Sequence, residues 1–142
     1  MHRLIYKSRA NGVIDKETFR DILYTSVELN RKHGVNGALI ASRSHYLQFL
    51  EGEHNIVADT FARIEKDNRH KNIVLITFSS IEKSFFADWR MRGFGLFDLN
   101  LELEKRLKQK YGEEDGGIRL PEDEQTALAL AQDTNMIINF ES

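Results

Sequence analysis

The sequence of 142 residues contains no cysteine and a single proline, Pro121. The absence of cysteine excludes disulfide bonds, thiolate zinc sites and a cysteine nucleophile. A lone proline disfavours a long proline-rich linker, so we expect one domain or one domain with an appendage. The longest strongly apolar run, Ile73–Phe78, is too short to span a bilayer. The N-terminal residues MHRLIYKSR also lack an apolar secretion segment. These absences predict a cytoplasmic protein that has no membrane partner.

An excess of charge of one sign is also absent. Lysine and arginine number 20 and aspartate and glutamate 22, which gives a formal net charge of −2. The charge balance therefore gives no reason to expect nucleic acid as a partner. The five histidines are scattered without the spacing of metal ligands, and the sequence has neither a glycine-rich phosphate loop nor a nucleophile–base set. We therefore expect neither a metal site nor an enzyme.

The pattern of apolar residues divides the first 94 residues into seven elements. Asp15 and Gly34 suit the two ends of the first helix, as an N-cap and as the residue that follows the last turn. The order β-α-β-β-α-β-β predicts an α+β fold with one sheet and both helices on one of its faces. Ile73–Phe78 is apolar throughout, which is typical of a strand covered on both faces. The expected strands are Arg3–Ser8, Ala38–Ala41, Tyr46–Leu50, Ile73–Phe78 and Trp89–Phe94, and the expected helices run from about Asp15 to His33 and from about Asn55 to Lys66.

The last 48 residues, 95–142, have the pattern of a helical tail. Leucines recur every four residues along Leu99–Tyr111, and Gly112 follows. Pro121 suits the first position of a second helix. The second face of the sheet also needs a cover, so we expect these two helices to pack on that face or on another subunit.

Three polar residues occupy positions where apolar ones are expected. Tyr6 lies in the first strand, Gln48 in the third, and Asn30 ends the inward face of the first helix. The first and third strands are often neighbours in this topology, so the three side chains are predicted to converge between the sheet and the helices. A buried amide needs hydrogen-bond partners for its donors and its acceptor. Each residue alone is more simply explained by the core or by a helix end, but the three together predict a binding site.

Five segments of the chain occur in the order and at the spacing of a known family. They read RLIYKS, NRKHGVNGAL, YLQFLEGE, RIEKDNRH and IEKSFFADWRM. LQFLEGE followed at a fixed spacing by DNRH is highly specific. On these segments, residues 2 to about 94 resemble BLUF domains, the blue-light sensors that use FAD. The chain departs from the usual pattern at Val35-Asn36-Gly37, at Leu29 and at Ser84.

The resemblance implies a ferredoxin-like fold in which the isoalloxazine ring of FAD lies between the two helices, against the sheet. It implies that Tyr6 donates an electron and a proton to the excited flavin and that Gln48 bridges this tyrosine and the ring. It further implies that Asn30 bonds the carbonyl and imide edge of the ring. Trp89 and Met91 match a pair that carries the signal outward, with either the tryptophan or the methionine beside the glutamine. The other implied contacts of the cofactor are Ile22, Ser26, Ile64, Asp67, Arg69 and His70.

The resemblance therefore implies a photoreceptor with residues 1–94 as the sensor and 95–142 as an extension for output or oligomerisation. A rearranged hydrogen bond of Gln48 would give a red-shifted signalling state, and the lack of cysteine excludes a thiol–flavin adduct. The implied partners are a second copy of the chain, as a dimer or larger oligomer, and a separate protein effector. The alternative is a regulatory domain of the same fold that binds a small molecule without photochemistry. An RNA-binding domain is disfavoured because it needs a basic surface and an aromatic motif that the sequence lacks.

Overall fold

The computed structural model describes residues 1–87, 89 and 91–141. It contains a five-stranded sheet, a two-stranded hairpin and four helices. Their order is β1 (His2–Ala10), α1 (Lys16–His33), β2 (Asn36–Ala41), β3 (His45–Gly52), α2 (His54–Glu65), β4 (His70–Ser80), β5 (Arg92–Gly95), α3 (Leu101–Tyr111), β6 (Glu113–Glu114), β7 (Gly117–Ile118) and α4 (Glu124–Glu141).

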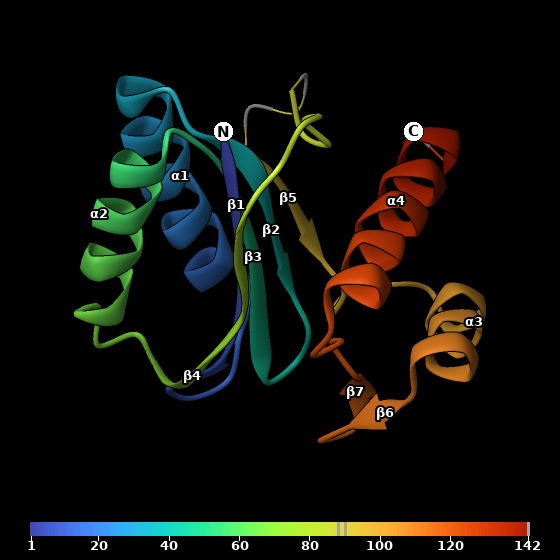
Figure 1. The fold of residues 1–142 in the computed structure, drawn as a ribbon. Helices are drawn as coiled ribbons and strands as arrows, with labels where there is room; N and C mark the ends of the chain where they lie inside the picture. Colours follow the sequence, from blue (N-terminus) through green and yellow to red (C-terminus); the bar gives the residue numbers. More distant parts are fainter. Residues whose placement is uncertain (88, 90, 142) are drawn as a thin grey trace.

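The molecule has three layers, with the large sheet in the middle (Figure 1). The strands follow the order β4-β1-β3-β2-β5, and all neighbours are antiparallel except β2 and β5. Helices α1 and α2 lie on one face of the sheet, and the tail with α3 and α4 lies on the other side (Figure 1). This arrangement confirms the predicted α+β, ferredoxin-like fold.

The ends of α1 form as the sequence predicts. The Asp15 carboxylate accepts a hydrogen bond from the backbone N–H of Thr18 at 2.8 Å, which satisfies one of the free amides of the first turn. Gly34 ends the helix with a φ of 71°, a left-handed conformation that glycine adopts without steric cost. Both ends of the helix are therefore specified by residues that are close in the sequence.

Alternation along β1 and β3 divides the core into two clusters, one on each face of the sheet. Leu4 and Leu50 belong to the cluster beneath α1 and α2. Ile5, Leu47 and Phe49 belong to the cluster beneath the tail. The α4 residues of this second cluster are Ala127, Leu130 and Ala131, all fully buried. The tail thus covers the second face of the sheet, which is the first of the two arrangements that we predicted for it.

The prediction that Ile73–Phe78 is covered on both faces is wrong. These residues lie in β4, which pairs only with β1 and forms an edge of the sheet. The side chains of Val74 and Leu75 are 45% and 49% exposed. An apolar run does not distinguish a central strand from an edge strand, because the pairing partner is chosen by the topology.

The later element boundaries also differ from those predicted. Trp89 precedes β5, which begins at Arg92, and the Arg90 position of the predicted strand lies outside the described residues. Helix α3 begins at Leu101, after the N-cap Asn100. Helix α4 begins at Glu124 rather than at Pro121, because the Asp123 carboxylate accepts the Thr126 N–H at 3.0 Å and caps the first turn. Between the helices, β6 and β7 form a short hairpin that the sequence did not predict.

Within the described part of the chain, no helix has the length and apolar composition needed to cross a membrane.

Candidate functional site

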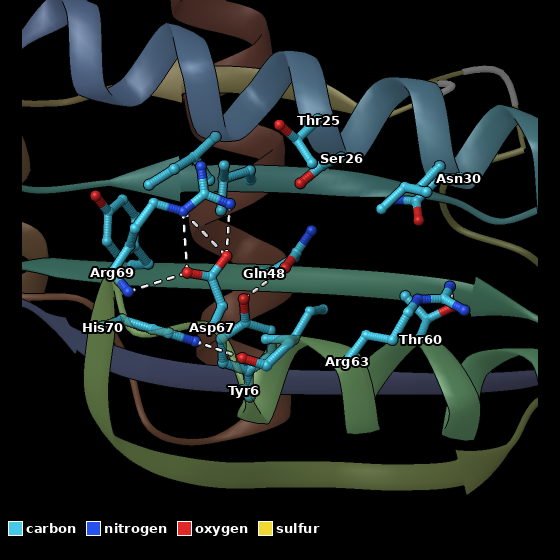
Figure 2. Close-up of a pocket in the computed structure, with 15 residues that line it drawn as sticks. Tyr6, Thr25, Ser26, Asn30, Gln48, Thr60, Arg63, Asp67, Arg69 and His70 are labelled. Carbon is cyan, nitrogen blue, oxygen red and sulfur yellow. Dashed lines mark hydrogen bonds and ion pairs between the residues drawn. The ribbon is translucent and has the colours of Figure 1, made fainter.

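A pocket lies between α1 and α2, with the sheet as its floor (Figure 2). It encloses about 100 Å³, within a hollow of about 640 Å³ that includes space open to solvent. Most of the accessible wall surface is apolar, although most of the lining side chains also carry a polar group. An apolar surface with polar groups around it is typical of a small-molecule site. The lining residues are Tyr6, Ile22, Thr25, Ser26, Leu29, Asn30, Leu39, Tyr46, Gln48, Thr60, Arg63, Ile64, Asp67, Arg69 and His70.

Tyr6 and Gln48 form a hydrogen-bonded pair on the floor of the pocket. They are register partners on β1 and β3, so their side chains leave the sheet side by side. The Tyr6 hydroxyl donates to Gln48 Oε1 at 2.5 Å (Figure 2). Burial raises the pKa of Tyr6 well above its usual value, and the nearby Asp67 carboxylate acts in the same direction. Tyr6 is therefore a neutral phenol whose proton lies on the path to Gln48.

The other end of the Gln48 amide faces Met91. Gln48 Nε2 donates to Met91 Sδ at 3.8 Å, and the Met91 side chain is buried in the pocket-side cluster. The backbone of Met91 has a φ of 65°, which costs a residue with a side chain about 1–2 kcal/mol. Trp89 packs instead in the cluster on the tail side of the sheet. In this structure the methionine lies beside the glutamine and the tryptophan does not.

Asp67, Arg69 and His70 line one end of the pocket, after α2. The Asp67 carboxylate accepts hydrogen bonds from two nitrogens of the Arg69 guanidinium, from Nη2 at 2.5 Å and from Nε to both oxygens at 3.0 Å. These bonds lower the pKa of Asp67 below its usual range. His70 Nε2 lies 2.7 Å from the Ile64 carbonyl oxygen, which can only accept, so this nitrogen carries a proton. His70 Nδ1 contacts the Ser8 hydroxyl at 2.7 Å and thereby ties the segment to β1.

Asn30 is one of three polar residues of α1 that line the pocket, together with Thr25 and Ser26 (Figure 2). Its side chain is buried, yet Nδ2 has no hydrogen-bond partner among the described residues. A buried donor without a partner costs about 1–3 kcal/mol. Such a group points to a ligand with an acceptor in the pocket.

Every residue predicted to contact a cofactor lines this one pocket. The pocket is also lined by residues that were not predicted as contacts from the sequence: Thr25, Leu39, Tyr46, Thr60 and Arg63. Tyr46 lies two residues before Gln48 on the same face of β3, so strand alternation was a signal that could have identified it. Trp89 is not among the lining residues, and Met91 reaches the site through Gln48. The described residues contain no group of three or more His, Cys, Asp or Glu that could hold a metal ion.

Comparison with known proteins identifies the domain that forms this pocket. Residues 1–92 match the family profile described as "BLUF: Sensors of blue-light using FAD". The β subunit of the photoactivated adenylate cyclase of Euglena longa is 25% identical over 89 residues, 62% of this chain and 10% of the cyclase. The α subunit from Euglena gracilis is 24% identical over 94 residues, 65% of this chain and 9% of the cyclase. The chain thus spans about a tenth of the length of these curated relatives.

Comparison with solved structures extends the similarity to BLUF proteins over more of the chain. The ground state of BlsA superposes with a TM-score of 0.73 at 25% identity, covering 94% of this chain and 86% of BlsA. The photo-activated state of BlsA gives 0.65 at 30% identity over 78% of this chain and 79% of BlsA. A bacterial light-regulated adenylyl cyclase shares the fold with a TM-score of 0.69 at 21% identity, but this chain covers only 36% of it. The chain therefore belongs to the BLUF family, whose domains sense blue light with FAD.

Proposed function

We propose that this chain is a blue-light receptor in which Tyr6 and Gln48 are the photoactive pair. The observation that carries the proposal is the hydrogen bond from the Tyr6 hydroxyl to Gln48 Oε1 on the floor of the pocket. A structural tyrosine–glutamine contact would need no hollow above it, whereas this pair faces one. The family assignment supplies the cofactor, FAD, that such a hollow would hold.

The residues of the pocket fit a flavin ring. A planar, largely apolar ring system suits a slot between two helices, where Ile22 of α1 and Ile64 of α2 both line the hollow. The unpaired Asn30 Nδ2 is a donor that a ring carbonyl would satisfy. Ser26, Asp67, Arg69 and His70 would bind the more polar parts of the cofactor. When bound, the flavin supplies the absorption of blue light and accepts the electron that Tyr6 releases.

The proton of Tyr6 moves within the protein. Because the phenol donates to Gln48 Oε1, the loss of an electron from Tyr6 makes its proton acidic and favours transfer to that oxygen. Once its oxygen is protonated, the Gln48 amide no longer has one end that only accepts and one end that only donates hydrogen bonds. The amide then rotates, and once the electron and the proton have returned to Tyr6 its hydrogen bonds remain rearranged without any covalent change. If the amide tautomerises instead, one proton has moved from its nitrogen to its oxygen. This rearrangement is the long-lived, red-shifted state.

Met91 lies outside the pocket lining, and the rearrangement of Gln48 changes its hydrogen bond with this glutamine directly. Gln48 donates to Met91 through Nε2, so exchanging the two ends of the amide removes this donor. The left-handed φ of Met91 carries strain that a second conformation of this segment would release. Trp89 and Met91 lie just before β5 and form the two-state element that passes the signal on.

Residues 95–142 form the output segment of this proposal. Helix α4 packs on the face of the sheet opposite the pocket. We assign the boundary to residue 94 and propose that light alters the tail and thereby a contact with a second copy or with a separate effector protein. The family assigns a sensor to residues 1–92, so the role that we propose for this chain is a sensory one and not an enzymatic one.

The photochemistry is tested by absorbance spectroscopy of the purified chain. We expect a yellow protein that releases FAD on denaturation and shows a small red shift under blue light that reverses in the dark. Tyr6→Phe and Gln48→Leu retain FAD and lose the shift. Tyr46→Phe is the matched control, because Tyr46 lines the same pocket and lies apart from the Tyr6–Gln48 bond.

A normal shift in Tyr6→Phe would contradict the assignment of the electron and proton donor. A colourless protein that does not take up added FAD would refute the receptor function. A chain that binds FAD and shows no light response would instead favour a small-molecule regulatory domain. Size measurement in the dark and under blue light then tests whether the output is a change of oligomer.

A further inference from the structure

Glu51 is a buried carboxylate outside the pocket that the photochemical proposal does not use. It lies on β3 three residues after Gln48, and its side chain points to the opposite face of the sheet. Its side chain is 1% exposed. A buried carboxylate is retained only when hydrogen bonds and an opposite charge replace its hydration.

Four groups donate hydrogen bonds to the Glu51 carboxylate: one guanidinium, one hydroxyl and two backbone N–H groups. Arg3, its register partner on β1, donates through Nε and Nη2 to Oε2, each at 2.8 Å. The Ser84 hydroxyl donates to Oε1 at 2.5 Å, and the backbone N–H groups of Phe85 and Phe86 donate to the same oxygen at 3.1 and 3.0 Å. The carboxylate therefore holds the turn at 84–86 on the sheet. Without it, two backbone amides of this turn would have no acceptor.

The turn at 84–86 carries the signalling segment. The Phe86 carbonyl accepts from the Trp89 N–H at 3.0 Å, and the two rings pack edge to face at 4.8 Å between centroids. Phe86 is fully buried, and its ring also packs on Phe49 of β3 at 5.0 Å. The position of Trp89, two residues before Met91, thus depends on where Glu51 holds Phe86.

Arg3 connects the same carboxylate to the tail. Its third nitrogen, Nη1, donates to Glu124 Oε1 at 3.1 Å, and Glu124 is the first residue of α4. One guanidinium therefore bridges the carboxylate that holds the turn and the carboxylate that begins the output helix. Because its planar fork binds both at once, a shift of Glu51 changes the geometry at Glu124.

We propose that Glu51 is the positioning residue that couples the Trp89–Met91 segment to α4, with Arg3 as the link. This inference rests on the proposed light response, since it states how that response leaves the pocket. Glu51 itself does not touch the pocket, so its removal separates flavin chemistry from output. The carboxylate couples the two segments by position, because it holds the turn at 84–86 directly and the start of α4 through Arg3.

The test is hydrogen–deuterium exchange of the full FAD-loaded chain in the dark and under blue light. Glu51→Gln removes the charge and retains the shape. We expect it to retain the red shift and to raise exchange about tenfold in the dark at segments 84–89 and 124–131, since local hydrogen bonds are lost. We also expect it to abolish the difference between light and dark at 124–131. Glu82→Gln, an exposed change in the same loop, is the matched control and leaves both segments as in the wild type.

Glu124→Gln is the second variant, because Glu124 is 35% exposed and its loss does not threaten folding. It removes the charge from the contact with Arg3 and so weakens only that contact. We therefore expect segment 84–89 to respond to light normally while the response of 124–131 falls. A normal light response of 124–131 in either variant would overturn the inference. So would an equal rise of exchange over the whole sheet in Glu51→Gln, which would show a merely structural role. If the wild type shows no red shift, the receptor function fails, whereas the dark exchange pattern still tests the placement of the two segments by Glu51.

Discussion

Among the described residues, buried polar side-chain atoms have hydrogen-bond partners, with one exception that lies at the pocket. Glu51 has a partner for each oxygen, and the Tyr6 hydroxyl has Gln48. The exception among the described residues is Asn30 Nδ2. An unpaired buried donor is costly, so a donor that remains unpaired beside a pocket indicates a ligand, whereas paired polar groups stabilise the fold.

The Asn30 donor predicts opposite effects on stability and on binding. Asn30→Leu has a similar volume and removes the unpaired donor, so we expect the FAD-free chain to gain about 1 kcal/mol of unfolding free energy. The affinity for FAD should fall about tenfold, because a hydrogen bond to the ring is lost. Urea unfolding of the FAD-free chain and FAD titration measure the two quantities.

Thr25→Val is the control for Asn30→Leu. Thr25 lines the pocket on the same helix, but its hydroxyl already donates to the Asp21 carbonyl at 3.0 Å. We expect its effect on stability to stay within about 0.5 kcal/mol. Loss of stability in FAD-free Asn30→Leu would show that the Asn30 amide serves the fold.

The raised pKa of Tyr6 predicts how the protein responds to alkaline pH. The unfolded chain releases the Tyr6 proton near the usual pKa of 10.0, whereas burial keeps it bound in the folded chain. Above that pH the folded state holds more protons than the unfolded state, so the contribution of Tyr6 to stability is lost as pH rises. We expect the ultraviolet titration of the folded wild type, minus that of Tyr6→Phe, to show no ionisation step near pH 10. A step there would mean that Tyr6 is accessible to solvent.

At the scale of elements, β2 and β3 must approach closely for Met91 to reach Gln48. A Cβ at Gly37 of β2 would stand 1.8 Å from the Phe49 carbonyl oxygen of β3 and 3.1 Å from Met91 Cε. A glycine is therefore required at this position for the strands to pair and for the methionine to lie beside them.

Gly37→Ala should lower the free energy of unfolding by about 3 kcal/mol, because the backbone of β3 has to move. In the folded fraction it should also alter the red shift, since Met91 loses its place. Gly52→Ala is the control, because its Cβ would stand 3.4 Å from Val57 Cγ2 and the side chain can give way. Thermal unfolding and the light-minus-dark spectrum of the two variants test this. Equal stability of both variants would refute the close approach.

On the scale of the whole molecule, the sensor and the tail carry opposite charge. Residues 1–94 hold 15 of the 20 basic and 11 of the 22 acidic residues, which leaves 5 basic and 11 acidic residues in 95–142. The contacts follow this division: Lys7 of β1 binds Glu114 at 3.0 Å and the Leu120 carbonyl at 2.8 Å, and Arg9 binds Asp115 at 3.0 Å. The tail is therefore held on the sheet by charge as well as by its apolar core.

Lys7→Met should loosen the hairpin of β6 and β7 while leaving the pocket intact. The Lys7 side chain is 5% exposed, whereas Glu114 is 31% exposed and regains water when Lys7 is removed. We therefore expect the free energy of unfolding to fall by about 2 kcal/mol, which is less than the full cost of an unpaired buried charge. Cleavage at Glu113 and Glu114 by a glutamate-specific protease should accelerate, with an unchanged flavin spectrum.

Lys16→Met is the control for Lys7→Met, since Lys16 is 74% exposed and meets Asp98 only at the surface. Its cleavage rate should equal that of the wild type. Unchanged cleavage in Lys7→Met would indicate that the apolar core alone holds the tail.

Much of the fold follows from local patterns in the sequence. The helix ends at Asp15 and Gly34 depend on a side chain and a backbone conformation within a few residues, so they were predictable. The alternation of β1 and β3 placed Tyr6 and Gln48 on one face, and the family motifs added the neighbouring pocket residues. Local pattern did not determine which strand lies at the edge, where α4 begins, or which residue Glu51 would bind.

The sequence by itself determined which side chains face the pocket side of the sheet, because strand and helix periods are properties of the chain alone. Only the tertiary structure decided that Met91, and not Trp89, lies beside Gln48. It also decided that Glu51 binds both Arg3 and a turn more than thirty residues away. Contacts between distant segments depend on the summed packing of both sheet faces, which local pattern does not encode.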